Sequence, residues 1–383
     1  MFISKPKKKW RRRVATAALG IFSFMLGVSL FARPYRPIEP LPGGIVDMHC
    51  HVAGIGAGGS GCFVSPKLRN SWKFGIYLRS FGVSRKELEQ LGDDLVPDRV
   101  AATLGQSKYI TQAVVLALDG VIGSNGWLDT NLTEVYVPNE FVLAATARHP
   151  NLRFGASVNP YRPDALERLT WAKEHGAVLV KWLPAIMHID PSDPRLEPFY
   201  RKLIELKLPL LSHAGQERSF SGATDSYGDP EKLRLPLRLG VTVIAPHIAS
   251  TGKYDGERSS ERLARLAAEF PNLYSDISSL TQLNKLGYLG EALRAPEFSG
   301  RLMYGSDFPL VNTALVTPWY YWGRLTPRQI FAITREKNPW DADVLLKQAL
   351  GTPAEIFSRS AKVFDFPPAA KTPFKPRALS PGS

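Results

Sequence analysis

Side chains able to bind a metal ion or move a proton stand where short apolar runs of this sequence end. They are His49 and His51 in residues 45–51, His213 in 209–213, His247 in 241–247 and Asp307 in 301–307. His49 and His51 are two residues apart, so in an extended strand both side chains point to the same face. By the same rule Asp47, two residues before His49, is expected to share the facing of His49 and to support the site or the fold rather than bind the metal. A single histidine is more often a hydrogen-bonded core residue. Four imidazoles and one carboxylate at strand ends instead suit a divalent ion with nitrogen and oxygen ligands, Zn²⁺ or Mn²⁺.

The elements that must position these residues alternate between strand and helix. Apolar, β-branched runs predict eight strands, at residues 45–51, 113–118, 153–158, 177–183, 209–213, 241–247, 272–277 and 301–307. Amphipathic stretches predict helices between or after them, at residues 84–103, 139–149, 163–175, 195–206, 230–239, 257–270, 280–294, 327–336 and 354–361. This order predicts an α/β fold, the (β/α)₈ TIM barrel, whose active sites lie at the C-terminal strand ends. A doubly wound open sheet is the alternative, but no Gly-rich phosphate fingerprint follows the first strand.

The loop after the first strand, residues 54–61, is rich in glycine and is expected to cover the barrel mouth. It lacks the Gly-Lys-Ser/Thr ending of a phosphate loop, which argues against nucleotide binding.

Five ordered motifs make residues 44–365 resemble the amidohydrolase superfamily, in particular its amidohydrolase-related (type 2) branch. They are Val46-Asp47-Met48-His49-Cys50-His51, Val180-Lys181-Trp182-Leu183-Pro184, Ser212-His213-Ala214-Gly215, Pro246-His247 and Tyr304-Gly305-Ser306-Asp307-Phe308-Pro309. The resemblance implies that His49, His51, His213 and Asp307 hold a catalytic metal. It implies that His247 polarises the substrate or supports the site, and that Lys181 could bridge a second metal as a carbamate. No other cofactor is implied.

The implied reaction is hydrolysis of an amide, lactone or ester of a small molecule. Asp307 would accept the proton of the attacking water, and His247 would stabilise the oxyanion. A decarboxylase of the same superfamily is the alternative, and it needs a cationic pocket that Arg69, Arg79 or Arg218 could supply. An inactive barrel that serves as a binding or scaffold protein is the third hypothesis. The presence of all five key residues argues against it.

The charge distribution excludes a nucleic-acid protein. The chain of 383 residues has a formal net charge of +13. Residues 1–36 hold nine Lys or Arg and residues 367–383 hold three, and neither end has an acidic residue. Residues 37–366 therefore carry 36 basic and 35 acidic side chains. A nearly neutral body offers no electrostatic footprint for a phosphate backbone.

The N-terminal segment is typical of a membrane anchor. A basic stretch, residues 1–13, precedes an uncharged run at 14–32, and a Pro-rich spacer follows at 33–43. The run is close to the roughly 20 residues that a spanning helix needs, and the basic flank is expected to stay cytoplasmic. We therefore expect a single-pass membrane protein with an exported catalytic domain. A secreted or periplasmic protein, released by signal cleavage, is the alternative. The polar, Pro-rich tail at 366–383 is expected to be disordered.

Cys50 and Cys62 are the two cysteines of the chain. An exported compartment would permit a disulfide between them but does not imply one.

Overall fold

The computed structural model describes residues 44–363 without a gap, and before them residues 10, 13–17, 19, 20, 23, 24, 27, 37, 41 and 42. The predicted tail at 366–383 lies outside the described residues, as do most of the basic segment and the spacer. The predicted membrane segment at 14–32 is described only in part. Within the described part of the chain, no helix combines the length and the apolar character that crossing a bilayer requires.

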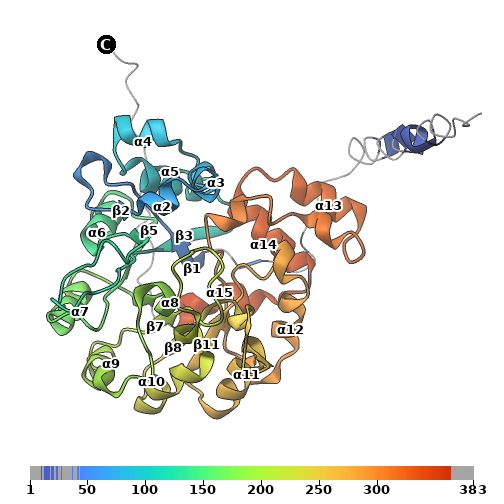
Figure 1. Cartoon of the computed structure of the whole chain (residues 1–383). Helices are drawn as coiled ribbons and strands as arrows, with labels where there is room; N and C mark the ends of the chain where they lie inside the picture. Colours follow the sequence, from blue (N-terminus) through green and yellow to red (C-terminus); the bar gives the residue numbers. More distant parts are fainter. Residues whose placement is uncertain are drawn as a thin grey trace, which may run out of the picture.

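Eight parallel strands form one sheet that helices surround (Figure 1). Their order in the sheet is β1 (Ile45–His51), β3 (Ile110–Leu116), β5 (Leu152–Ala156), β6 (Leu179–Trp182), β7 (Leu210–Ser212), β8 (Val243–Ala245), β11 (Leu273–Asp276) and β12 (Leu302–Met303). Each predicted strand is present, so the (β/α)₈ barrel is confirmed. Most strands are shorter than predicted, because the polar residues at their C-terminal ends turn out of the ladder toward the barrel mouth.

An irregular segment nearly closes the barrel between β12 and β1. The amide of Met48 donates to the carbonyl of Tyr304 over 3.3 Å, and that of His51 donates to the carbonyl of Phe308 over 2.8 Å. In the opposite direction, the amide of Asp307 donates to the carbonyl of His49 over 2.8 Å. Closure of the barrel therefore places Asp307 directly beside the two histidines of β1.

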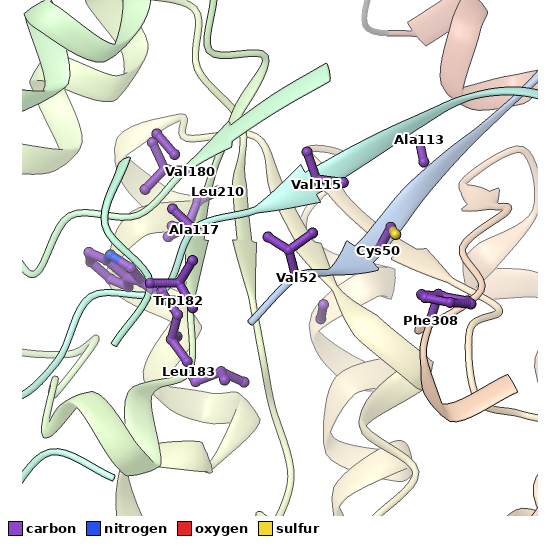
Figure 2. Close-up of a cluster of buried hydrophobic side chains, with 14 of the residues drawn as sticks. Cys50, Val52, Ala113, Val115, Ala117, Val180, Trp182, Leu183, Leu210 and Phe308 are labelled. Atoms are coloured by element: carbon purple, nitrogen blue, oxygen red, sulfur yellow. The ribbon is translucent and has the colours of Figure 1, made fainter. Parts of the chain in front are cut away.

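Alternate residues of each strand face the barrel interior or the helices. The interior cluster is apolar and consists of Val46, Met48, Val114, Leu116, Leu179, Leu211, Ile244 and Met303. The residues between them, including Val115, Val180 and Trp182, pack outward in the larger cluster of Figure 2. Trp182 contacts Phe199 and Tyr200 of α9 (Glu197–Glu205), so it belongs to this outer layer and not to a substrate pocket.

A register shift in β1 separates Asp47 from the histidines. The pairing with β3 is irregular between Asp47 and Cys50. Val46 and Met48 face the interior, whereas Asp47 accepts hydrogen bonds from Ser306 and from the Trp340 indole, over 2.9 and 2.8 Å. The expectation that Asp47 shares the facing of His49 is therefore wrong. The Asp47 carboxylate instead links β1 to the segment after β12 and to the helix that contains Trp340.

The helices largely follow the prediction. They are α2 (Pro66–Arg69), α3 (Trp72–Ser80), α4 (Arg85–Leu91), α5 (Leu95–Leu104), α6 (Asn139–Arg148), α7 (Ala165–Glu174), α8 (Pro184–Met187), α9, α10 (Arg234–Leu239), α11 (Ser259–Glu269), α12 (Tyr288–Arg294), α13 (Pro327–Thr334), α14 (Pro339–Ala349) and α15 (Ala354–Val363). The last helix closes the N-terminal end of the barrel, where Ser360 Oγ donates to the carbonyl of Val46 over 2.9 Å. Helices α2, α3, α8 and α14 were not predicted.

The single helix predicted at residues 84–103 is two helices. Gly92 ends α4 with a φ of 88°, a left-handed conformation that glycine adopts without strain. The Asp93 carboxylate then accepts hydrogen bonds from the Gly56 amide and the Ser60 hydroxyl, over 2.8 and 2.5 Å. These hydrogen bonds fix the Gly-rich loop, and its residues Gly54 and Ile55 line the cavity at the barrel mouth.

Cys50 and Cys62 are both free and buried.

Candidate metal centre

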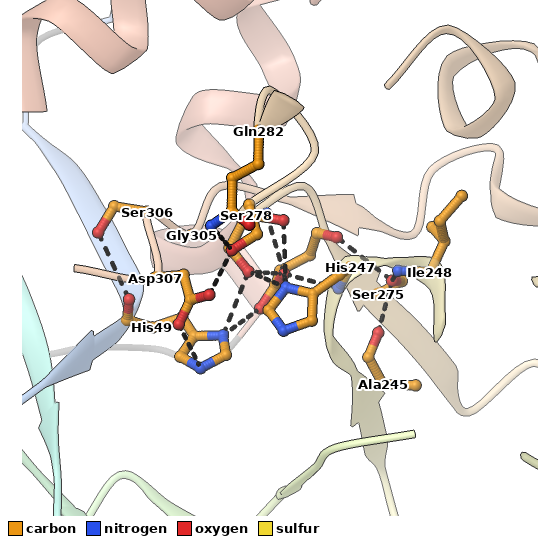
Figure 3. A network of polar contacts seen from close by, with 12 residues as sticks. His49, Ala245, His247, Ile248, Ser275, Ser278, Gln282, Gly305, Ser306 and Asp307 are labelled. Carbon is orange, nitrogen blue, oxygen red and sulfur yellow. Dashed lines mark hydrogen bonds and ion pairs between the residues drawn. The ribbon is translucent and has the colours of Figure 1, made fainter. Parts of the chain in front are cut away.

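A buried carboxylate holds the ring of His49, which Figure 3 shows beside Asp307 and His247. Its Nδ1 lies 3.0 Å from Oδ2 of Asp276, at the end of β11. A carboxylate only accepts hydrogen bonds, so the proton of the neutral imidazole is on Nδ1 and the lone pair is on Nε2. An imidazole oriented by a carboxylate in this way is the usual arrangement of a metal-ligating histidine.

Polar atoms converge on this lone pair. Nε2 of His49 lies 3.2 Å from Nε2 of His51 and 3.6 Å from Oδ1 of Asp307. Oδ1 of Asp307 is in turn 3.3 Å from Nε2 of His51. His49, His51 and Asp307 thus offer three ligand atoms within 4.8 Å of one another. His49 and His51 of β1 therefore lie close to Asp307, which follows β12, as the sequence predicts.

Asp307 is held so that one carboxylate oxygen faces the histidines. Its Oδ2 accepts a short hydrogen bond from the Ser279 hydroxyl, which itself accepts from the Gln282 amide over 2.9 Å. Its backbone is left-handed, with a φ of 61°, and such a non-glycine conformation marks local strain that the surroundings must maintain. The hydrogen bond from the Asp307 amide to the His49 carbonyl, together with the Ser279 contact, maintains this conformation.

His247 follows β8 and stacks on His49, with ring centroids 5.2 Å apart. Its Nδ1 lies 3.1 Å from the carbonyl oxygen and 2.7 Å from the hydroxyl of Ser278. The carbonyl oxygen only accepts, so these contacts assign the proton to Nδ1 and leave Nε2 as the acceptor nitrogen. His247 and Ile248 have φ values of 55° and 48°, and Ser275 holds the second with a 3.0 Å hydrogen bond.

His213 lies at the edge of the cluster. Its ring centroid is 5.6 Å from that of His247, and its buried Nε2 has no hydrogen-bond partner among the described residues. Oε2 of Glu217 is 3.7 Å away, beyond hydrogen-bonding range. A buried ring nitrogen without a partner fits a position that an absent ligand completes.

Lys181 is fully buried at the end of β6, and its Nζ lies 3.2 Å from Nε2 of His49. The predicted bridging lysine therefore reaches the cluster. Burial lowers the pKa of this ammonium to about 8, although Asp307 and Asp276 favour its charge.

Burial also keeps the imidazoles of His49, His213 and His247 neutral. It lowers the pKa of His49 to about 4, with a further contribution from the charge of Lys181. It likewise lowers the pKa of His213 and His247. Burial alone would raise the pKa of Asp307, but the neighbouring histidines outweigh it and hold the pKa well below the usual range. Neutral imidazoles and an ionised carboxylate are the forms that bind a metal ion, so the donor set fits one.

A cavity of about 640 Å³ opens above the cluster. His49, His51, His213, His247, Asp307 and Lys181 all line it, together with apolar side chains from α3 and from the loop at residues 313–320. The volume is in the range of small-molecule sites.

Several polar residues of this site were not predicted from the sequence, and some residues predicted for it lie elsewhere. Asp276, Ser278, Gln282 and Lys285 were not selected, although Asp276 stands at a predicted strand end as Asp307 does. Of the three arginines proposed for a cationic pocket, Arg218 lines the cavity, while Arg69 donates to the carbonyl of Ile55 and Arg79 lies in a separate hollow. The other three histidines, His149, His175 and His188, follow the C-terminal ends of α6, α7 and α8.

Comparison with known proteins identifies the family. A protein-family model described as Amidohydrolase matches residues 46–357. The chain therefore belongs to this amidohydrolase family, and the resemblance seen in the sequence motifs is confirmed. No curated protein matches the chain.

Several solved structures are similar to this chain at low sequence identity. An uncharacterised TIM-barrel protein from Bordetella bronchiseptica is 18% identical, with a TM-score of 0.47 over 80% of this chain and 99% of that one. A probable 2-pyrone-4,6-dicarboxylic acid hydrolase from Acinetobacter baumannii is 16% identical, with a TM-score of 0.47 over 84% and 100%. A 5-carboxyvanillate decarboxylase from Novosphingobium aromaticivorans, with bound manganese, is 11% identical, with a TM-score of 0.45 over 85% and 97%. Likenesses this distant do not indicate which reaction the present chain catalyses.

Proposed function

We propose that this amidohydrolase is a metal-dependent hydrolase of an amide, lactone or ester. The observation that carries the proposal is the convergence of His49 Nε2, His51 Nε2 and Asp307 Oδ1 at the floor of the cavity. These three atoms would hold a divalent ion such as Zn²⁺ or Mn²⁺, with His213 Nε2 as a further ligand. A divalent ion bound there lowers the pKa of a coordinated water and polarises a substrate carbonyl.

Asp307 is the proposed general base. Its Oδ1 faces the histidines and would also contact the ion, while Ser279 holds Oδ2, so Oδ1 is the oxygen that would accept a proton from an attacking water beside the ion. The same oxygen then returns the proton to the leaving nitrogen or oxygen, which completes the acid–base cycle.

His247 is proposed to act as an acceptor. The oxyanion-stabilising role implied by the resemblance needs an N–H on Nε2, whereas the Ser278 contacts place the proton on Nδ1. Burial also disfavours a doubly protonated ring by lowering the pKa of His247. Nε2 would therefore accept a hydrogen bond from the attacking water or complete the metal site.

Metal content tests the proposal. We expect about one equivalent of Zn²⁺ or Mn²⁺ per chain after metal-replete expression, and loss of it in His49→Ala and His213→Ala. Asp307→Asn should bind the ion more weakly and lose turnover on a panel of esters, lactones and amides. His175→Ala is the matched control, because His175 caps α7 and stacks on Trp171 away from the cavity. Full metal content in His49→Ala would refute the assignment.

Decarboxylation is a second candidate, because the cavity has a cationic side. The buried ammonium group of Lys285 lines it and would attract a carboxylate substrate. Release of CO₂ from carboxylic acids, measured on the metal-loaded chain beside the hydrolysis panel, separates the two reactions.

A further inference from the structure

Lys285 is a buried cation that lacks a partner. It ends a short 3₁₀ helix, Leu283–Lys285, after β11, and its side chain lines the cavity with only 6% of the residue exposed. Across residues 44–363, no hydrogen bond or ion pair reaches its Nζ. Buried ammonium groups are normally paired, because their desolvation is costly. A ligand in the cavity would supply the missing partner.

The other cations of the cavity are already satisfied. Lys181 donates to His49 Nε2, and Lys73 lies 3.2 Å from the carbonyl oxygen of Arg218 and 3.4 Å from that of Ser219. Arg218 itself donates to the Gln216 side chain. Lys285 is therefore the cation that the described residues leave for a ligand.

Nearby charges limit which anion fits. Burial lowers the pKa of Lys285, whereas the carboxylates of Asp307 and Glu217, which do not contact it, favour its charged form and would repel an incoming anion. A single lysine beside two carboxylates suits a monoanion better than a dianion such as phosphate, because the repulsion grows with the ligand charge. A carboxylate is the monoanion that an ammonium binds well.

The walls of the cavity indicate the rest of the ligand. Phe74, Tyr77 and Phe81, on or just after α3, face the cavity together with Phe220 and Leu315 from two other loops. Such walls favour an apolar or aromatic body.

We propose that Lys285 binds the carboxylate of a substrate whose remaining body is apolar or aromatic and packs against α3. The carboxylate sits on the β11 side of the cavity, and the reacting group is thereby directed to the cluster of His49, His51 and Asp307. The inference rests on the proposed function in that it takes this cavity to be the substrate site.

Binding to the metal-free chain tests the inference without any catalysis. The full chain is treated with EDTA and titrated calorimetrically with benzoate and with the neutral isostere benzamide. Removing the metal prevents the carboxylate from binding the ion instead of the lysine. We expect benzoate to bind more tightly than benzamide, and Lys285→Met to weaken benzoate by about ten- to hundredfold with no change for benzamide.

Two variants sharpen the result. Lys285→Arg should keep the preference for benzoate, because it retains the charge. Lys73→Met is the matched control, since Lys73 lines the same cavity but already contacts two backbone carbonyls, and it should change benzoate affinity by less than about threefold. Equal affinity of the wild type for both ligands would overturn the proposal, as would loss of the preference in Lys73→Met.

Thermal unfolding excludes a purely structural role. Removing an unpaired buried charge should raise or preserve the Tm of the ligand-free Lys285→Met variant. A marked fall in Tm, with both ligands weakened alike, would show that Lys285 supports packing and would refute the anion site. The metal-content experiment is independent, so either proposal can fail without the other.

Discussion

The carboxylate behind His49 gives the sharpest test of the metal centre. Oδ2 of Asp276 accepts from His49 Nδ1, and Oδ1 accepts from the amides of His247 and Ser278, over 3.1 and 3.0 Å. Three N–H groups thus surround one anion. Asp276→Asn keeps the size of the side chain but replaces one acceptor oxygen by an NH₂ donor. If the amide oxygen stays with the two backbone amides, the NH₂ group faces the N–H of His49.

That conflict acts on the tautomer of His49. To relieve it, the imidazole must move its proton to Nε2, so that Nδ1 accepts from the new amide. Nε2 then has no lone pair for a metal ion. Removal of an outer carboxylate of this kind typically weakens metal binding by about 10- to 100-fold. This corresponds to about 1.4 to 2.8 kcal/mol. We expect the Asp276→Asn variant to fall in this range while remaining folded.

The affinity for Zn²⁺ is measured by competition with a chromogenic chelator. Circular dichroism then shows whether the variant is folded. The matched control is Asp98→Asn, which breaks the 2.6 Å contact between Asp98 and His149, a histidine–aspartate pair that does not line the cavity. Its metal affinity should equal that of the wild type. If Asp276→Asn also binds Zn²⁺ with wild-type affinity, Asp276 does not set the tautomer of His49 and the argument fails.

Two further predictions concern Lys181 and acid stability. Elemental analysis in the presence of bicarbonate should find one metal equivalent per chain in both the wild type and Lys181→Met. Two equivalents in the wild type that fall to one in the variant would instead indicate a bridging carbamate on Lys181. We also expect the Tm of the EDTA-treated chain to fall as the pH is lowered from 6.5 to 4, because burial depresses the folded-state pKa of His49 from 6.5 to about 4. Neutral His49 contributes roughly 3 kcal/mol to the free energy of unfolding at a pH above its pKa in the unfolded chain. This contribution is lost as the pH falls toward its pKa in the folded chain. A Tm that stays constant or rises over this range would contradict the burial argument.

The barrel could be predicted because each strand carries a local signal. The runs that became β3 and β8 are rich in the β-branched residues Val and Ile, and helical stretches separate the strands along the chain. Helix ends were harder. The helix predicted at 84–103 breaks because the Asp93 carboxylate binds Gly56 and Ser60 of a distant loop, a tertiary contact that no local pattern reveals. Helix α14 was missed although its start, Asn338-Pro339, has the cap and the proline of a helix N-terminus.

The site was predictable where residues stand at strand ends and unpredictable elsewhere. The rule that selected Asp307 applies equally to Asp276, which ends β11, so that omission was avoidable. Lys285 had no such signal, because it lies in a short 3₁₀ helix after β11, where tertiary packing decides that its side chain is buried. The irregular pairing of β1 reversed the expected facing of Asp47, since one shift in register exchanges the two faces of a strand.

The charges around the cavity connect the metal proposal with the substrate proposal. With the imidazoles neutral, the buried groups near its floor are the carboxylates Asp276, Asp307 and Glu217 and the ammonium groups Lys181 and Lys285, a net charge of −1. A negative floor weakens, but does not cancel, the attraction of Lys285 for an anionic substrate. Binding of a divalent ion would change the net charge to +1, which a monoanionic substrate then neutralises. The order of binding follows from this balance: benzoate should bind the metal-loaded chain more tightly than the metal-free chain, and Lys285→Met should weaken both.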